Sequence, residues 1–365
     1  MHKKAISITI WFIVLAFTVL FVFLSFFLMS LTINASQSRN SALSIAQTSS
    51  LTSLSQGLEG RVIILDPGHG AGNTNTFEGY DEQVRMLALA NKIKPLLEER
   101  GATVLMTRPS ETDVILPVRT ALINKWALET IREVRQEELT ELEELFEAGA
   151  ISSEQGLHRL RRDVRELDRL IGIMQRIIDN PDSYAGVYFN FPFDTTHTRQ
   201  IHSDLRRVFE LKTDPVIRDN FLMISLHSNA TPRPINTRIN GADSFFISNN
   251  LRNNTNYFAN YANVQRSSYF ANLIITNIDP LGIRRNRASA RNLFMIREIN
   301  MPSVLVENGF HTNPIDRARL QDDDFLSRLA VVYADTITAY FANLENIHDR
   351  PIDNLDETFG AMRLM

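Results

Sequence analysis

An apolar run that ends in a histidine between two glycines, residues 61–70 (Arg-Val-Ile-Ile-Leu-Asp-Pro-Gly-His-Gly), most constrains what this chain can fold into. Val62 to Leu65 form the kind of continuous apolar, mostly β-branched segment expected of a central strand covered on both faces. Pro67 and the glycines exclude a helix after Asp66 and allow a tight loop around His69. On this run alone, a metal ligand and an idle loop histidine are equally good interpretations of His69.

Composition narrows the chemistry that such a loop could carry. The chain has 365 residues, enough for at least one large core, and a formal net charge of -4. It lacks the basic stripe that nucleic acid requires, so we expect no nucleic-acid partner. Cysteine is absent, which excludes disulfides, thiol nucleophiles and cysteine-bound metals. A metal ion would therefore need His, Asp or Glu ligands.

The N-terminal segment is predicted to lie in a membrane. Residues 5–33 are almost wholly apolar and uncharged, and exceed the roughly 20 residues that cross a bilayer. Residues 1–34 are thus an expected transmembrane anchor, or a signal if they are cleaved, and residues 35–59 an expected flexible linker. Lys3 and Lys4 favour an N-terminus in the cytoplasm and an exported body. We expect anchoring in a bacterial inner membrane with the remainder in the periplasm, or secretion after cleavage.

The segment after His69 has the pattern of an α/β domain. A polar loop is followed by an amphipathic helix that includes Glu82 and ends at Gly101, with Pro95 as a sign of a kink or of two shorter helices. Residues 103–108 then form a second expected strand, completing a β-loop-α-β unit. Glu82 therefore lies near the start of a helix, close to the loop of His69. Acidic residues are common in a first helical turn for electrostatic reasons alone.

Two later apolar runs end in the same way as the first. Within residues 219–230, an apolar strand that ends at Ser225-Leu226 leads to His227, and residues 303–306 lead to Glu307. Sites in open α/β sheets form at the carboxyl ends of strands, so we expect these side chains to meet. His69, Glu82 and His227 would supply the two-histidine, one-carboxylate set of a catalytic zinc, and Glu307 a spare carboxylate for proton transfer. This set suits metal-assisted amide hydrolysis.

The chain closely resembles the zinc-dependent N-acetylmuramoyl-L-alanine amidases of bacterial cell-wall turnover, the Amidase_3 family. The resemblance spans residues 62–126 and 217–345. Its matching pieces are Asp-Pro-Gly-His-Gly at 66–70, Glu82 with Leu87 and Ala90, Thr107-Arg108, Ile-Ser-Leu-His-Ser-Asn-Ala at 224–230, and Pro-Ser-Val-Leu-Val-Glu-Asn-Gly-Phe at 302–310 with Asn313 and Asp316.

The resemblance implies a function and assigns roles. It implies that His69, Glu82 and His227 bind Zn²⁺, that Glu307 is the catalytic carboxylate, and that the substrate is the amide between N-acetylmuramic acid and L-alanine of the peptidoglycan stem. Cell-wall remodelling, including daughter-cell separation, is the expected setting. The alternatives are a zinc peptidase or deacetylase that acts on another peptidoglycan bond, and a catalytically silent wall-binding protein.

Other polar residues have weaker assignments. Arg297 matches a basic position of the family and is a candidate for substrate binding, with a structural ion pair as the alternative. Asn229 is a second substrate-binding candidate. His311 lies where the family pattern has no histidine, and we expect it at the surface or in the substrate cleft. His158 and His202 are expected to be solvated.

Residues 127–216 form an expected, mainly helical insertion in the family's minimal domain. Apolar residues at helical spacing indicate two helices, before and after Gly149, and residues 152–155 (Ser-Ser-Glu-Gln) fit a capping box. In a branch of the family that acts in cell division, a similar insertion blocks the zinc cleft until an activator protein displaces it. An activator acting on the insertion and a permanently packed scaffold are both open interpretations here.

The expected fold is α/β, with a twisted, mostly parallel central sheet flanked by helices. Residues 60–345 form the zinc amidase catalytic domain, interrupted by the helical hairpin insertion. Residues 256–278 and 325–341 are expected helices that cover the two faces of the sheet. Residues 346–365 are an expected C-terminal tail.

Overall fold

The computed structural model describes residues 57–189, 201–232, 235–249 and 261–344. Within these ranges, no helix has both the length and the apolar character needed to cross a bilayer. The expected membrane segment 1–34, most of the linker 35–59 and the tail 346–365 lie outside the described residues.

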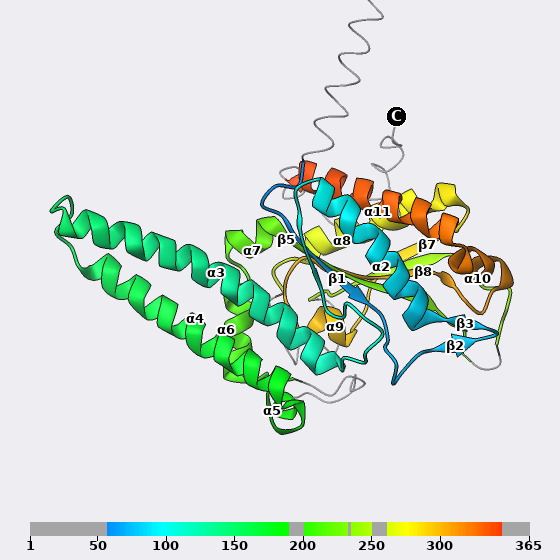
Figure 1. Cartoon of the computed structure of the whole chain (residues 1–365), viewed down its shortest axis with the longest axis horizontal. Coiled ribbons are helices and arrows are strands. Elements are labelled where there is room, and N and C mark those ends of the chain that lie inside the picture. The colour runs from blue at the N-terminus through cyan, green and yellow to red at the C-terminus, as the bar shows by residue number, and fades with distance from the viewer. Residues whose placement is uncertain (1–56, 190–200, 233–234, 250–260, 345–365) are drawn as a thin grey trace, which may run out of the picture. The chain divides into compact units, whose positions relative to one another are not determined.

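A six-stranded sheet organises the described chain (Figure 1). Four of the five strand pairs are parallel: β4, β1, β5 and β8 form one parallel block, β6 pairs antiparallel with β8, and β7 pairs parallel with β6. The predicted, mostly parallel sheet is thus confirmed. In spatial order its strands are β4 (Thr103–Met106), β1 (Val62–Pro67), β5 (Phe221–Asn229), β8 (Ser303–Phe310), β6 (Ala242–Phe246) and β7 (Arg285–Ala290).

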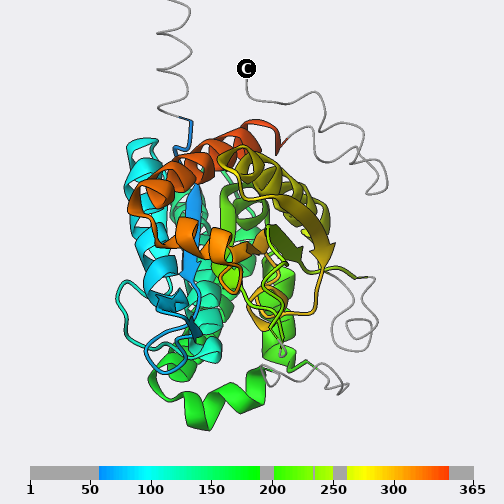
Figure 2. The same ribbon diagram turned by 90° about the vertical axis from the view of Figure 1, so that its right-hand side faces the viewer.

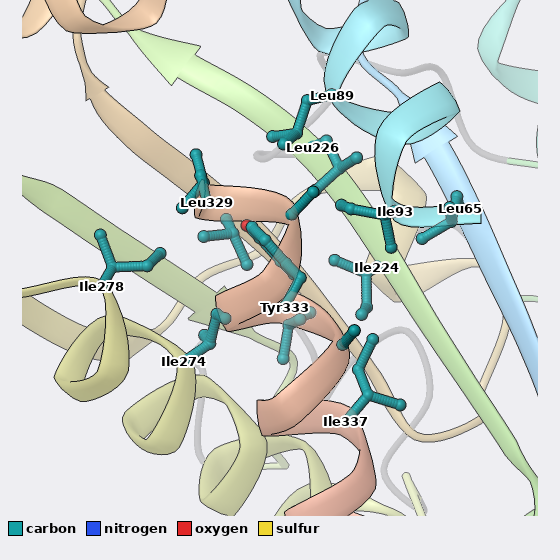
Figure 3. Packing of buried hydrophobic residues seen from close by; sticks show 14 of the residues in the cluster. Leu65, Leu89, Ile93, Ile224, Leu226, Ile274, Ile278, Leu329, Tyr333 and Ile337 are labelled. Atoms are coloured by element: carbon teal, nitrogen blue, oxygen red, sulfur yellow. The ribbon is translucent and has the colours of Figure 1, made fainter. Parts of the chain in front are cut away.

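Helices pack on both faces of the sheet because the inner strands are apolar on both faces. On β1, Ile63 and Leu65 point into one core cluster and Ile64 into another. The first cluster is covered by α2 (Glu82–Glu99), α8 (Val264–Ile278) and α11 (Asp323–Ala342). Figure 3 shows this packing: Ile224 and Leu226 of β5 meet Ile93 of α2 and residues of α8 and α11.

The second face is covered by α3 (Leu116–Glu147) and by helices of the expected insertion. The expectation that 256–278 and 325–341 lie on opposite faces is therefore wrong, since α8 and α11 contact each other and share the first face (Figure 2). The insertion supplies part of the apolar side chains of the second face, and α9 and the start of α3 supply others. The remaining helices are α4 (Gln155–Asp179), α5 (Pro181–Tyr188), α6 (Ser203–Leu211), α7 (Pro215–Asn220), α9 (Phe294–Arg297), α10 (Pro314–Gln321) and the 3-10 turn η1 (Asp279–Leu281).

The predicted helical hairpin is present as α3 and α4, which run side by side (Figure 1). Gly149, with a φ of 70°, separates them as expected. The helix α3 passes without a break through the expected boundary at residue 127. The capping box is wrong: α4 begins at Gln155, and its N-cap residue Glu154 makes no side-chain capping bond.

Two other helices differ in detail from the expectation. The helix α2 is continuous through Pro95. Proline lacks the N–H that would bond the carbonyl one turn earlier, but this turn near the helix end is exposed, so water can bond that carbonyl instead. The helix α8 begins at Val264 rather than at 256. Side chains of Asn249 and Asn300 bond the backbone of Tyr261 and Ala262, which holds these residues outside the helix. Residues 256–260 lie outside the described ranges.

Candidate metal centre and active site

The carboxyl ends of three adjacent parallel strands bring the candidate residues together. The strands β1, β5 and β8 neighbour one another in the sheet, so their ends share one edge. His69 follows β1, while His227 and Glu307 lie side by side in the register of β5 and β8. The fourth residue, Glu82, begins α2, where the N-cap Asp81 accepts a hydrogen bond from the backbone of Gln83. The expectation that these side chains meet is confirmed.

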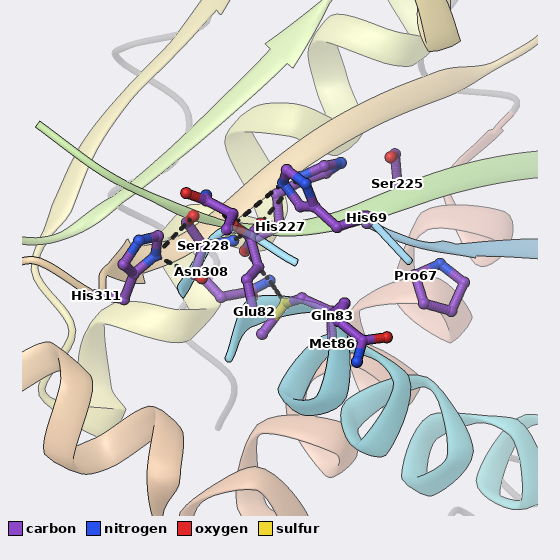
Figure 4. A network of polar contacts seen from close by, with 12 residues as sticks. Pro67, His69, Glu82, Gln83, Met86, Ser225, His227, Ser228, Asn308 and His311 are labelled. Atoms are coloured by element: carbon purple, nitrogen blue, oxygen red, sulfur yellow. Dashed lines mark hydrogen bonds and ion pairs between the residues drawn. The ribbon is translucent and has the colours of Figure 1, made fainter. Parts of the chain in front are cut away.

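Glu82 contacts both histidines (Figure 4). Its Oε2 is 3.2 Å from His69 Nε2, and its Oε1 is 3.0 Å from His227 Nδ1. The carboxylate is fully buried, whereas the two imidazoles keep 19% and 18% of their side-chain surface exposed. The backbone N–H of Ser228 and the side-chain amide of Asn75 also donate to Glu82. The Glu82 carboxylate is therefore held in place, and of these three side chains only the histidines are exposed to solvent.

These distances suit a shared metal ion. Two nitrogen or oxygen ligands at about 2.0–2.1 Å from a tetrahedral zinc are roughly 3.3 Å apart, close to both observed separations. The ligand atoms of His69, Glu82 and His227 all lie within 4.8 Å of one another. His69 Nδ1 and Glu307 Oε2 are buried without a hydrogen-bond partner. The donor set and its spacing thus fit zinc.

The electrostatics of the group follow from burial and from the pairing of opposite charges. Burial alone would raise the pKa of Glu82, but its bonds to His227 and His69 hold that pKa well below the ordinary value. Burial alone would lower the pKa of His69, but the hydrogen bond to Glu82 and the charge of Glu82 outweigh burial and raise this pKa above its ordinary value. Glu307 differs: burial, reinforced by the charge of Glu82, raises its pKa to about 8. One carboxylate is thus held ionised while its neighbour readily takes up a proton, a division typical of acid-base sites.

A buried ionic cluster under the His69 loop fixes the position of that loop. Asp66 accepts hydrogen bonds from Thr107 at 2.5 Å, Ser225 at 2.6 Å and Arg119 at 3.0 Å. Arg119 also donates to the backbone carbonyls of Pro67 and His69. Burial would raise the pKa of Asp66, but Arg119 and the hydroxyl donors hold it below the ordinary value. The loop is therefore bound through its backbone and not only through packing.

Replacing Arg119 by methionine is expected to lower the free energy of unfolding by about 3–5 kcal/mol, because the buried Asp66 carboxylate loses its counter-charge. Urea denaturation followed by circular dichroism measures this loss. The matched control is Arg132→Met, which removes an exposed pair with Asp168 worth about 0–1 kcal/mol. Equal losses in the two variants would contradict the role of Arg119.

Backbone geometry explains the glycine before His69. A Cβ on Gly68 would lie 2.4 Å from Cε1 of His227, so a side chain there would displace the second histidine. His69 itself has a φ of 60°, in the left-handed region that side chains rarely adopt. Strained backbone of this kind persists where surrounding bonds determine it, here those of Arg119.

Two further polar side chains, those of Tyr80 and His311, hold Ser228, whose backbone N–H donates to Glu82. The Tyr80 hydroxyl lies 2.9 Å from Ser228 Oγ, which lies 3.0 Å from His311 Nδ1, and the Tyr80 and His311 rings stack with centroids 5.0 Å apart. His311 is fully buried, so the expected surface position is wrong. Tyr80 covers its ring, and Arg317 binds its carbonyl.

The remaining candidates lie apart from the metal ligands. Arg297 is 1% exposed and pairs with Glu298 at 2.8 Å, which fits the structural alternative given for it. Asn229 lies two residues beyond His227 on β5 and lines a surface pocket. His158 is exposed beside Glu154, and His202 is half-buried and caps α6.

Sequence reasoning missed several residues that hold the site. Arg119 lies in the first turns of α3, where an arginine usually faces solvent, and the one sequence signal was that Asp66, at the end of an apolar strand, needs a counter-charge. Asn75 lies in a polar loop without a local signal. Tyr80 precedes Glu82 by two residues in the short hairpin of β2 (Thr76–Phe77) and β3 (Tyr80–Asp81), which the sequence pattern does not predict.

Residues 63–131 and 207–339 match the model of the Amidase_3 family, described as N-acetylmuramoyl-L-alanine amidase. The matched ranges cover more than half of the chain. The chain belongs to this amidase family. Its unmatched internal segment, 132–206, lies within the insertion expected at 127–216. Family membership and the geometry of the four residues thus agree.

Curated relatives match over a shorter stretch. The chain is 46% identical over 66 residues to a protein named "Probable cell wall amidase LytH" of Staphylococcus saprophyticus, a stretch that covers 17% of this chain and 23% of that protein. It is 41% identical over 58 residues to the germination-specific N-acetylmuramoyl-L-alanine amidase of Bacillus subtilis, covering 16% and 24%. The chain thus spans about a quarter of the length of the curated relatives it matches.

Among solved structures, the chain is similar to the catalytic domain of CwlV, an N-acetylmuramoyl-L-alanine amidase from Bacillus (Paenibacillus) polymyxa. The identity is 18% and the TM-score 0.42, over 77% of this chain and 98% of that one.

Proposed function

We propose that this chain is a zinc-dependent amidase that hydrolyses the bond between N-acetylmuramic acid and L-alanine in peptidoglycan. The observation that carries the proposal is the position of Glu82 within hydrogen-bond distance of both His69 and His227, with Glu307 beside His227 in the sheet. Membership of the amidase family supports the choice of substrate. A zinc peptidase or deacetylase would use the same ligand set on a different bond.

Each residue has a chemical task in this reaction. His69, Glu82 and His227 would hold zinc, which when bound acidifies a water molecule and polarises the scissile carbonyl. Glu307 accepts the proton of the attacking water and returns it to the leaving amine of L-alanine. Its raised pKa suits the second half of this transfer, since the carboxyl keeps the proton until the amine departs. Asn75 and Ser228 keep the Glu82 carboxylate turned toward the histidines.

Digestion of purified peptidoglycan tests the proposed function. The full chain, loaded with zinc, is incubated with the wall material with and without a chelator, and the new ends are identified by mass spectrometry. Free stem peptides that begin at L-alanine are expected only without chelator. New ends at another peptide or acetyl bond would favour the peptidase or deacetylase, and unchanged wall material would support the silent wall-binding protein.

The proposed location is the bacterial cell envelope, with the catalytic residues on the periplasmic side of the inner membrane. The uncharged apolar run 5–33 after Lys3 and Lys4 supports an uncleaved anchor, and residues 35–59 would give the catalytic domain reach toward the wall. Protease protection of spheroplasts tests this: the catalytic domain should be digested from outside.

The helical hairpin is the proposed contact site for an activator protein. Residues at its far end form a separate small cluster around Leu139 and Leu157, distinct from the two clusters on the sheet. The continuous helix α3 connects this end to Arg119, which binds the carbonyl of His69. A partner bound there would thus act on the metal loop through a single rigid element.

Deletion of residues 138–160, with a short glycine link in their place, tests this role. Basal release of stem peptides is expected to stay within about twofold of the full chain, because the hairpin base that packs on the second core is retained. Acceleration by any activator should be lost. A large rise in basal release would instead show that the hairpin end restrains the site, as the autoinhibited alternative requires.

A further inference from the structure

A pocket of about 550 Å³ opens next to the metal residues and has no task in the reaction described above. It lies at the carboxyl ends of β5 and β8 and beside β6 and β7. Its lining includes the side chains of Asn229, Asp243, Arg284, Arg287 and Phe310.

The pocket lies on the same face of the sheet as the catalytic carboxylate. Asp243 is the antiparallel partner of Glu307, so the two side chains leave the sheet on one face. Asn229 follows His227 by two residues on β5, beyond a shift in the β5–β8 register, and its side chain forms a hydrogen bond with Asp243. Two residues of extended chain span at most about 7 Å, so Asn229 lies within that reach of His227.

The charge of the pocket favours an anionic ligand. The pocket is lined by two arginines, Arg284 and Arg287, and by one carboxylate, Asp243, which is buried and 3.6 Å from Arg287 Nε. Arg287 keeps 62% of its side chain exposed and can turn toward a bound group. A guanidinium binds a carboxylate with two parallel hydrogen bonds, a geometry that an amide cannot match.

The two sides of the scissile bond differ in charge. The muramoyl side has no carboxylate left, because its lactyl carboxyl forms the amide. The peptide side carries a carboxylate, or its amide, on the glutamyl residue that follows L-alanine. An extended chain spans about 3.3–3.6 Å per residue, so this group lies roughly 7 Å from the scissile bond, the same reach as from His227 to Asn229.

We infer that this pocket binds the α-carboxylate of the second stem residue, and that Arg287 makes cleavage selective for stems in which this group is ionised and not amidated. The inference rests on the proposed function and extends it to substrate choice. Arg287 is thus a specificity-determining residue on an edge strand, remote from the zinc ligands in sequence.

Two muramoyl dipeptides test the inference, both with the γ-carboxyl blocked as a methylamide: N-acetylmuramoyl-L-alanyl-D-glutamate with a free α-carboxylate, and its α-amide. The zinc-loaded full chain is expected to cleave the carboxylate form with a kcat/KM about tenfold higher, the size of one charge-assisted hydrogen bond. In Arg287→Gln the preference should fall to about twofold or less, through a higher KM for the carboxylate form. The matched control, Arg328→Gln, removes an exposed arginine on α11 and should keep the preference.

Failure of the inference and failure of the proposed function give different results. Equal cleavage of both dipeptides by the unmodified chain, or a preference that survives in Arg287→Gln, would overturn the inference and leave the amidase intact. If neither dipeptide is cleaved, the proposed function fails. Calorimetry then measures the Kd values of both dipeptides for the Glu307→Gln chain, with and without Arg287→Gln. Tighter binding of the carboxylate form that is lost in Arg287→Gln would support the inference, and equal Kd values would overturn it.

Discussion

Replacing Glu307 by glutamine is expected to lower kcat for stem release by about 10²–10⁴-fold, the contribution typical of a positioned general base. Glutamine keeps the size of the side chain but cannot accept and return a proton. Since Glu307 is not among the metal ligands, the variant should still bind one zinc per chain. Steady-state cleavage of a muramoyl peptide, paired with zinc analysis of the same sample, measures both quantities.

The control for this variant is Glu99→Gln, the same change at an exposed position of α2. It should leave both cleavage and zinc content as in the unmodified chain. Loss of zinc together with activity in Glu307→Gln would mean that Glu307 is a ligand and not the proton carrier. Full activity would mean that another group moves the proton.

Replacing His227 by alanine is expected to weaken zinc binding by at least about 100-fold and to abolish cleavage. Removal of an outer partner of a metal ligand already costs about 10–100-fold, and here a direct ligand is lost. The change also removes one of the two histidines that hold Glu82 ionised, so the pKa of Glu82 should rise toward its ordinary value. Competition with a chromogenic chelator measures the affinity.

His158→Ala is the matched control, since His158 is exposed on the hairpin and pairs only with Glu154 among the described residues. It should leave zinc affinity and cleavage unchanged. Unaltered zinc affinity in His227→Ala would show that the metal is held elsewhere. The proposed role of Glu82 would then also fail, because Glu82 contacts His227 directly.

The site residues that could be predicted from sequence are those that stand at the end of a buried strand, because the strand both forms the core and positions the residue. Residues 62–65, 221–226 and 303–306 are apolar except for Ser225 and Ser303, because their strands are covered on both faces, and each run ends at a polar side chain. Neighbouring parallel strands then place these ends at one edge without further information. His69, His227 and Glu307 could be grouped for this reason.

Contacts made by side chains that look ordinary in the sequence could not be predicted. Arg119 resembles a solvated arginine of an amphipathic helix, yet it is 2% exposed and binds Asp66. The strand β7 has no apolar alternation, because it lies at the edge of the sheet, where Arg287 is exposed. The sharing of one face by α8 and α11 depends on α3 occupying the other, which local periodicity does not encode.

The central claim, that His69, Glu82 and His227 hold the zinc through which the chain cleaves muramoyl amides, is tested most directly by adding zinc back to metal-free protein. Stem release from N-acetylmuramoyl-L-alanyl peptide is followed as zinc is added to the apo chain. The account predicts no release without metal and a linear rise that saturates at one zinc per chain. Release by the metal-free chain, or no release at saturating zinc, would contradict it.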